Sequence, residues 1–260
     1  MIVTNLNSWV VCSKPIAQAR LRLFCFPYAG GGALVFRDWP NYFPPSVEIC
    51  AIQLPGRESR WREPLFTHWE PLVQALTDSL QPYLDRPFAF FGHSLGALVS
   101  FELARALARQ TDFAPLHLFV SGHSAPQVPN TDPAIHQLPD PEFIKKLDSL
   151  NGTPAGVLQN AELMELFLPV LRADFTINET YTYTPGPLLE CPVSAFGGLQ
   201  DKMFPSAEIE GWRDQTRQAF TLRMLPGDHF FMHSARPLLL RSLVQDLSQS
   251  FSQQNGNQRL

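Results

Sequence analysis

The chain has 260 residues, of which 45% are hydrophobic, 17% are charged and only 15 are glycine. This length and apolar content favour a compact domain with a large buried core, and they exclude a collagen-like repeat and argue against a disordered chain. The formal net charge of -4 supplies no basic field for nucleic acid or an anionic membrane, so we expect neither as a partner and look instead to a small molecule or another protein.

Short apolar runs rich in β-branched and aromatic residues predict strands, and several are separated by segments with apolar residues at helical spacing. Strands that alternate with helices and are apolar on both faces are typical of a mostly parallel central sheet flanked by helices, so the predicted fold class is α/β. In chain order, the predicted strands are 21–26, 47–53, 87–91, 116–121, 192–196 and 220–225, and the predicted helices are 69–83, 95–109, 207–218 and 237–251.

Residues 125–187 interrupt this alternation. They contain two helical patterns, 141–150 and 161–181, among many prolines, and they are too numerous for an ordinary loop. We interpret them as an inserted helical lid over the carboxyl ends of the strands, with residues 1–124 and 188–260 forming the core. A plain excursion that thickens one layer is the alternative.

The four cysteines, Cys12, Cys25, Cys50 and Cys191, form no C-x-x-C pair and no metal-ligand spacing. We therefore interpret them as buried free thiols. The chain starts without the basic and apolar segments of a signal peptide, and no stretch approaches 18 uninterrupted apolar residues, so we predict a cytoplasmic protein.

The motif with the clearest chemistry is Gly92-His93-Ser94-Leu95-Gly96, between a predicted strand and a predicted helix. It matches the nucleophile elbow G-x-S-x-G in its required strand, turn and helix context. A strand that turns sharply into a helix needs glycines on both sides of the turn residue, so that the Ser94 hydroxyl can project from a strained backbone. A glycine-rich turn without catalytic function is the alternative.

A serine alcohol needs a general base, and the base needs an orienting acid. In α/β-hydrolases the chain order is serine, acid, histidine. Asp201 follows the predicted strand 192–196 and His229 follows the strand 220–225, so both are expected at the same sheet edge as Ser94. The candidate triad is Ser94, Asp201 and His229.

Four other residues compete for these roles. Asp132 and Asp140 follow the strand 116–121, where some hydrolases place their acid, and His123 follows the same strand. Asp228 adjoins His229, but adjacent side chains rarely meet in triad geometry. We keep these alternatives open and favour Asp201 with His229.

A metal centre is a further alternative. His229 and His233 have i, i+4 spacing, but no glutamate lies between them and no third ligand is evident. We expect no metal there and expect His233 on a helix surface or at a helix cap.

A second glycine cluster, Gly30-Gly31-Gly32, directly follows the predicted strand 21–26. It fits neither G-x-G-x-x-G nor G-K-[ST], which argues against a phosphate cradle. In a hydrolase such a loop supplies an oxyanion donor, so the backbone amides of Ala29 and Leu95 are the candidate oxyanion hole. A flexible turn is the alternative.

Five motifs in this order resemble those of the type II thioesterases, stand-alone α/β-hydrolases that accompany nonribosomal peptide and polyketide synthases. They span about residues 20 to 250. The motifs are FPYAGGGA at 26–33, QLPGRE at 53–58, FGHSLGA at 91–97, GGLQD at 197–201 and PGDHFFM at 226–232.

The resemblance implies the α/β-hydrolase fold with a helical lid, in which Asp174-Phe175 and residues 178–181 also look similar to the family. It places the family's triad on Ser94, Asp201 and His229 and its oxyanion amides on Ala29 and Leu95.

The resemblance also implies hydrolysis of acyl thioesters on the phosphopantetheine arm of an acyl or peptidyl carrier protein, through an acyl-enzyme on the serine. The arm belongs to the partner, so we expect no cofactor. The alternatives are a general esterase or lipase, a cyclising thioesterase domain cut from a synthase, and a non-catalytic module that binds carrier proteins. The start methionine argues against a cut domain.

The charged residues Arg57, Glu58 and Arg60 are interpreted first as a solvated turn. A carrier-facing or loop-ordering role is the alternative.

Four aromatic residues are candidates for binding the acyl chain. Core packing is the default interpretation for a buried aromatic side chain. The candidates are Tyr28, Phe167, Phe175 and Phe230.

Overall fold

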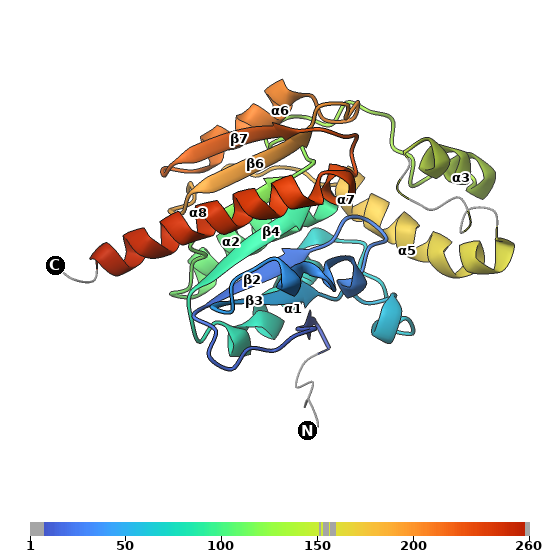
Figure 1. Cartoon of the computed structure of the whole chain (residues 1–260). Coiled ribbons are helices and arrows are strands. Elements are labelled where there is room, and N and C mark those ends of the chain that lie inside the picture. Colours follow the sequence, from blue (N-terminus) through green and yellow to red (C-terminus); the bar gives the residue numbers. More distant parts are fainter. Residues whose placement is uncertain (1–7, 151, 153–155, 157–159, 258–260) are drawn as a thin grey trace.

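The computed structural model describes residues 8–150, 152, 156 and 160–257. In this part of the chain, seven strands form one sheet in the order β1-β3-β2-β4-β5-β6-β7 (Figure 1). β1 runs antiparallel to β3, and every other neighbouring pair is parallel. The strands are β1 (Val10–Val11), β2 (Leu21–Phe26), β3 (Val47–Ile52), β4 (Phe88–His93), β5 (Leu118–Ser121), β6 (Val193–Gly198) and β7 (Phe220–Leu225).

Helices cover both faces of the sheet (Figure 1). One buried cluster joins the sheet to α1 and α2, and a second joins it to α8 and the short helices η1 and η2. Because helices pack on both sides, β3 and β4 are buried at every position, which explains why most of their residues are apolar. The α-helices are α1 (Trp69–Leu80), α2 (Leu95–Gln110), α3 (Asp140–Ser149), α5 (Ala161–Glu179), α6 (Ser206–Glu210), α7 (Phe231–Ser234) and α8 (Arg236–Asn257), and the 3₁₀ helices are η1 (Ala33–Phe36), η2 (Trp39–Asn41), η3 (Glu58–Arg60), η4 (Gln81–Tyr83) and η5 (Gly211–Gln215).

The predicted α/β class and all six predicted strands are confirmed, with small shifts at their ends. Two helix predictions were too long. α1 ends at Leu80, and a 3₁₀ turn containing Pro82 follows it; the predicted helix 207–218 is α6 followed by η5. The edge strand β1 was not predicted, because two residues carry no readable periodicity.

Between β5 and β6 the chain leaves the sheet and forms α3 and α5, at the positions predicted for the two helical patterns. The described residues of 125–187 contain no strand. Figure 1 shows both helices beyond one end of the sheet rather than over its faces. None of the helices described is long and apolar enough to cross a bilayer.

A buried polar network joins α8 to the sheet near the start of β5. The imidazole of His117 forms hydrogen bonds with the Ser250 hydroxyl at Nδ1 (2.8 Å) and with the Ser194 hydroxyl at Nε2 (2.9 Å). Ser194 donates to Asp246, which also accepts two hydrogen bonds from Arg223. Burial lowers the pKa of His117 to about 4, so this histidine is neutral in the folded protein near pH 7.

This pKa predicts that acid reduces stability. An unfolded histidine has a pKa of about 6.5, so below that pH the unfolded chain gains a proton that folded His117 does not take up until about pH 4. The stabilisation is complete above pH 6.5 and is lost as the pH falls, with a cost from His117 of about 2 kcal/mol at pH 5. Urea unfolding at pH 7 and pH 5 measures this loss.

The His117→Asn variant should lose less stability than the wild type between these two pH values, by about 2 kcal/mol. Ser250→Ala is the matched control, because it removes one hydrogen bond but retains the imidazole; it should keep the wild-type pH dependence. An unchanged pH dependence in His117→Asn would contradict the assignment.

Candidate active site

Ser94 lies at the sharp turn between β4 and α2, with its backbone in the left-handed region at φ 54°. A Cβ on Gly92 would lie 2.0 Å from the Gly96 carbonyl oxygen, and a Cβ on Gly96 would lie 2.2 Å from the Phe26 carbonyl oxygen. Neither position can hold a side chain without moving backbone. The predicted elbow geometry is thus confirmed, and it leaves Ser94 half-buried while the residues beside it are buried.

The imidazole of His229 is paired with a buried carboxylate. Its Nδ1 donates to Oδ2 of Asp201 over 2.9 Å, and the Asp201 side chain is 0% exposed. The backbone amide of Met203 donates to the other carboxylate oxygen, Oδ1, over 2.8 Å. Both oxygens therefore have a donor, and the orientation of the ring of His229 is held.

The two loops that carry this pair stay together because the pairing of β6 and β7 continues past the strand ends. The amide of Leu199 donates to the Leu225 carbonyl (2.8 Å), and that of Gln200 donates to the Gly227 carbonyl (2.9 Å). In return, the Gly227 amide donates to the Gln200 side chain (2.6 Å). The parallel register thus carries Asp201 and His229 to the same end of the sheet as Ser94.

The hydrogen bond to Asp201 decides which nitrogen of His229 is basic. With the proton on Nδ1, a neutral ring has a lone pair on Nε2. Ser94 and His229 line the same cavity, so the site contains both a histidine base and a serine hydroxyl. The arrangement can therefore supply a nucleophile, a base and an orienting acid.

The competing residues lie elsewhere. Asp132 and Asp140 are exposed, and Asp140 pairs with Arg172 of α5 over 2.6 Å. Exposed Asp228 accepts a hydrogen bond from the Phe230 amide at the start of α7.

His123 is buried, and its Nδ1 donates to the Ser124 carbonyl over 2.9 Å. Burial lowers its pKa to about 4. The bonds of His123 within the described residues involve no carboxylate, so it lacks the acid partner that His229 has.

His233 is exposed on α7, as expected for a helix-surface residue, and its Nε2 shares a hydrogen bond with the Tyr28 hydroxyl over 3.3 Å.

The predicted oxyanion donors lie beside Ser94. Leu95 is the first residue of α2, so its amide has no acceptor within the helix. Ala29 follows β2 in the loop that faces the helix, and both residues line the cavity with Ser94. Two amides at this place can bind a negatively charged oxygen.

The cavity at Ser94 is mostly apolar and, with its solvent-open mouth, holds about 570 Å³. Side chains from α3 and α5 form part of its wall, so the segment between β5 and β6 contributes to the site. The lining residues are Tyr28, Ala29, Ser94, Leu95, Leu147, Leu150, Gly152, Leu171, Phe175, Asn178, Met203, Phe204, His229 and Phe230.

Three of the four aromatic candidates, Tyr28, Phe175 and Phe230, line this cavity, and Phe167 does not. Phe167 lies one helical turn before Leu171, which is on the wall, and its side chain is 38% exposed. The structure therefore does not bring Phe167 to the cavity wall, because helical spacing shows the face of a residue but not where along the helix the cavity ends.

A buried ion pair fastens α5 to the glycine loop. Asp174 of α5 accepts two hydrogen bonds from the Arg57 guanidinium, at 2.6 and 2.9 Å, and one from the Gly30 amide at 2.7 Å. Arg57 also donates to the Gly31 carbonyl over 3.2 Å. The two side chains are only 4% and 2% exposed, so this contact fixes the loop that presents Ala29.

The interpretation of Arg57 and Arg60 as a solvated turn was therefore wrong. Arg60 is also buried, donates to the Gln53 carbonyl and pairs with Glu63. Glu58 is exposed, but its carboxylate accepts a hydrogen bond from the Leu34 amide over 3.0 Å. These contacts support the alternative role of ordering the loop. The sequence around Arg57 does not reveal that its partner is Asp174, which is 117 residues further along the chain.

Comparisons with known proteins agree with this geometry. The family model described as "Thioesterase domain" matches residues 21–247. The gramicidin S biosynthesis protein GrsT of Aneurinibacillus migulanus is 46% identical over 94% of this chain and 96% of its own length.

Two solved structures are similar over nearly their whole length. The type II thioesterase BorB from the borrelidin biosynthetic cluster has a TM-score of 0.84 and 33% identity, covering 91% of this chain and 96% of its own. YbtT, a type II thioesterase from the yersiniabactin NRPS/PKS biosynthetic pathway, has a TM-score of 0.83 and 28% identity, covering 94% and 100%.

The Arg57–Asp174 pair predicts a large loss of stability when one charge is removed. Asp174→Asn leaves a guanidinium buried without a counter-charge, which should lower the free energy of unfolding by about 3–5 kcal/mol. Asp140→Asn is the matched control, because it breaks the more exposed Asp140–Arg172 pair and should cost under about 1 kcal/mol. Urea unfolding of both variants measures the difference, and equal losses would contradict the prediction.

Proposed function

This chain belongs to the thioesterase domain family, and from that membership we propose that it is an editing type II thioesterase of a nonribosomal peptide or polyketide synthase. Its substrates in this proposal are acyl groups bound as thioesters to the phosphopantetheine arm of an acyl or peptidyl carrier protein. The similarity to GrsT, BorB and YbtT supports the link to such biosynthetic pathways.

One observation carries the catalytic part of the proposal: His229, paired with Asp201, lines the same apolar cavity as Ser94. A serine hydrolase uses a serine nucleophile, a histidine base and an acid that orients the histidine, and these residues are of those three types. The apolar wall suits an acyl chain. Ala29 and Leu95 line the same cavity, which supports the proposal that their amides bind the oxygen of a tetrahedral intermediate.

In the first half of the reaction, Ser94 attacks the thioester carbonyl carbon. His229 takes the hydroxyl proton on Nε2 as the new C–O bond forms, while Asp201 stabilises the resulting imidazolium. The amides of Ala29 and Leu95 bind the oxyanion. Collapse of this intermediate breaks the C–S bond, and the thiol leaves with the proton from His229.

In the second half, water replaces the thiol. His229 takes a proton from the water as it attacks the acyl-enzyme, and the collapse of the second tetrahedral intermediate returns that proton to Ser94 and releases the acid. This chemistry requires no cofactor of the enzyme's own, since the pantetheine arm arrives with the carrier protein. We further propose that residues 125–187, whose helices form part of the wall, act as the lid.

The proposal predicts that Asp201→Asn lowers kcat by about 10⁴-fold, because an amide does not hold His229 in the required tautomer. Asp132→Asn, which changes an exposed carboxylate after β5, should retain wild-type activity. Steady-state kinetics with one acyl thioester compare the two. Near-full activity of Asp201→Asn with loss in Asp132→Asn would move the acid to the earlier loop.

The substrate class is tested by comparing kcat/KM for an acyl-carrier protein, the same acyl group on coenzyme A, and its nitrophenyl ester. We expect the carrier-bound thioester to be hydrolysed most efficiently. Ser94→Ala is the control and should remain folded with only residual turnover, since the triad acts as a unit.

Three results would contradict the proposal. Preference for the nitrophenyl ester by orders of magnitude would favour a general esterase or lipase, and a cyclic product in place of the free acid would favour a cyclising enzyme. Binding of the carrier protein with no turnover of any thioester would favour a non-catalytic module.

A further inference from the structure

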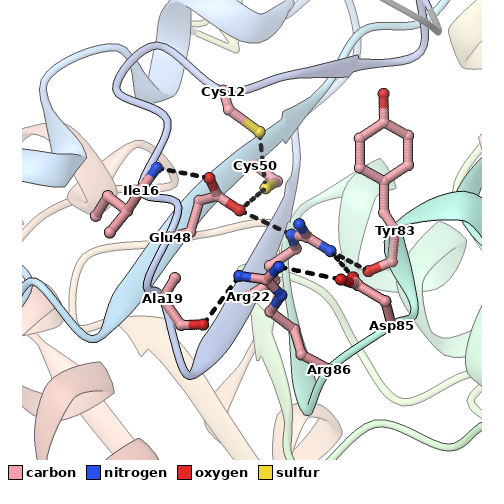
Figure 2. A network of polar contacts seen from close by, with 9 residues as sticks. All are labelled: Cys12, Ile16, Ala19, Arg22, Glu48, Cys50, Tyr83, Asp85 and Arg86. Atoms are coloured by element: carbon pink, nitrogen blue, oxygen red, sulfur yellow. Dashed lines mark hydrogen bonds and ion pairs between the residues drawn. The ribbon is translucent and has the colours of Figure 1, made fainter.

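Two cysteines face each other at the edge of the sheet that β1 forms. In the antiparallel register, Val10 pairs with Ile52 and Val11 with Ala51. The same register places Cys12 opposite Cys50, and their Sγ atoms lie 2.9 Å apart. Figure 2 shows the two side chains pointing toward each other.

The backbone at this position suits a covalent link. The Gln53 amide donates to the Trp9 carbonyl over 2.9 Å, so residues 9 and 53 form a hydrogen-bonded pair. Because the two types of pair alternate along an antiparallel ladder, Cys12 and Cys50 fall on a non-hydrogen-bonded pair, with Cα atoms about 4.5 Å apart. That separation lies within the range of about 4.4–6.8 Å found for disulfides.

The two thiols differ in their access to solvent. Cys50 is fully buried, and Cys12 is only half-buried. Burial raises the pKa of the Cys50 thiol well above its ordinary value. An oxidant therefore reaches Cys12 first, and Cys50 is placed to react second, with the sulfur that has already been oxidised.

Polar groups hold this pair in place. Oε2 of Glu48 lies 4.0 Å from the Cys50 Sγ, and the other oxygen of this carboxylate accepts a hydrogen bond from the Ile16 amide over 2.8 Å. Oε2 also accepts from Arg22 Nε over 2.7 Å. Figure 2 shows Arg22 continuing this network to Tyr83 and Asp85.

A metal ion is the other ligand class that two thiols and a carboxylate could suggest, since one ligand atom each from Cys12, Glu48 and Cys50 lies within 4.8 Å of the others. The Glu48 carboxylate, however, is already occupied by the guanidinium of Arg22 and by a backbone amide. A cation here would have to sit beside the positive charge of Arg22 or displace it. The surroundings favour a reaction between the thiols.

We propose that Cys12 and Cys50 are a modification site, at which a hydroperoxide converts the two thiols into a reversible disulfide. The Cys12 thiolate attacks one peroxide oxygen and the O–O bond breaks, which gives a sulfenic acid and, for hydrogen peroxide, one water. The Cys50 sulfur then displaces the hydroxyl group from Cys12, and the S–S bond forms as that hydroxyl leaves with the Cys50 proton as a second water. Two sulfurs lose two electrons in total and the peroxide gains them; a dithiol reverses the reaction.

The link would fasten an edge strand that is two residues long and pairs with β3. It would also close a loop containing β2 and both short helices η1 and η2. Constraining this loop in the unfolded chain should raise the thermal midpoint by roughly 5–10 °C. β3 and β2 lie between this edge and β4, so we expect turnover to stay within about twofold.

The test treats the full-length chain with hydrogen peroxide and counts the thiols that can be alkylated after denaturation. Four cysteines are present, so we expect four alkylated thiols before oxidation, two after it, and four again after dithiothreitol. Non-reducing peptide mapping should find the peptides containing Cys12 and Cys50 joined. The rise in thermal midpoint should appear and reverse with the cross-link.

Variants separate this pair from the other thiols. Cys12→Ser and Cys50→Ser should each lose the cross-link and the rise in thermal midpoint; should Cys50→Ser fail to fold, the half-buried Cys12 decides alone. Cys25→Ser is the matched control, because Cys25 is also buried, and it should keep both.

Three outcomes would overturn the proposal: four thiols remaining after peroxide, further oxidation of Cys12 without a joined peptide, or a cross-link through Cys25 or Cys191. A fourth would favour a metal site instead. That outcome is one equivalent of zinc blocking alkylation of Cys12 and Cys50 in the reduced chain, with the protection lost in Glu48→Gln. None of these results depends on the thioesterase activity.

Discussion

The site depends on the close approach of the first turn of α2 to the ends of β4 and β2. Gly96 lies so close to the Phe26 carbonyl, at the end of β2, that a Cβ there would be 2.2 Å from that oxygen. The helix can begin at this place only because both flanking positions are glycine. The same close approach brings the loop after β2 beside the start of α2, so that Ser94, Ala29 and Leu95 reach one cavity.

Buried polar groups then fix segments that are distant in the sequence. Only 17% of the residues are charged, yet several charged side chains are buried, and those whose contacts are described above are paired. Asp174 joins α5 to the glycine loop, and Asp246 joins α8 to β6 and β7. A buried charge is costly unless its partner is in place. These ion pairs therefore fix the positions of α5 and α8 more strictly than apolar packing alone would.

The parallel sheet also explains how Asp201 comes to be the partner of His229. Both residues follow strands whose pairing continues for two residues beyond the strand ends, through the backbone bonds from Leu199 to Leu225 and from Gln200 to Gly227. Asp132 and Asp140 follow β5 in the chain but lie on the way to α3 and at its first residue. Both are exposed, and Asp140 pairs with Arg172. Asp201 is the partner of His229 because the two residues follow neighbouring strands, β6 and β7, and its position along the chain alone would not have distinguished it from its competitors.

By itself, the sequence determined the features that depend on local pattern: the six main strands, the elbow with its two glycines, and the order of serine, aspartate and histidine after successive strands. The tertiary structure alone decided which distant residues meet. The Arg57–Asp174 pair and the Cys12–Cys50 pair join residues 117 and 38 positions apart, and Phe167 lies outside the cavity although it shares a helix with Leu171 and Phe175. Periodicity shows which side of an element is buried, whereas these contacts depend on where its neighbours end, and that is set by packing across the whole molecule.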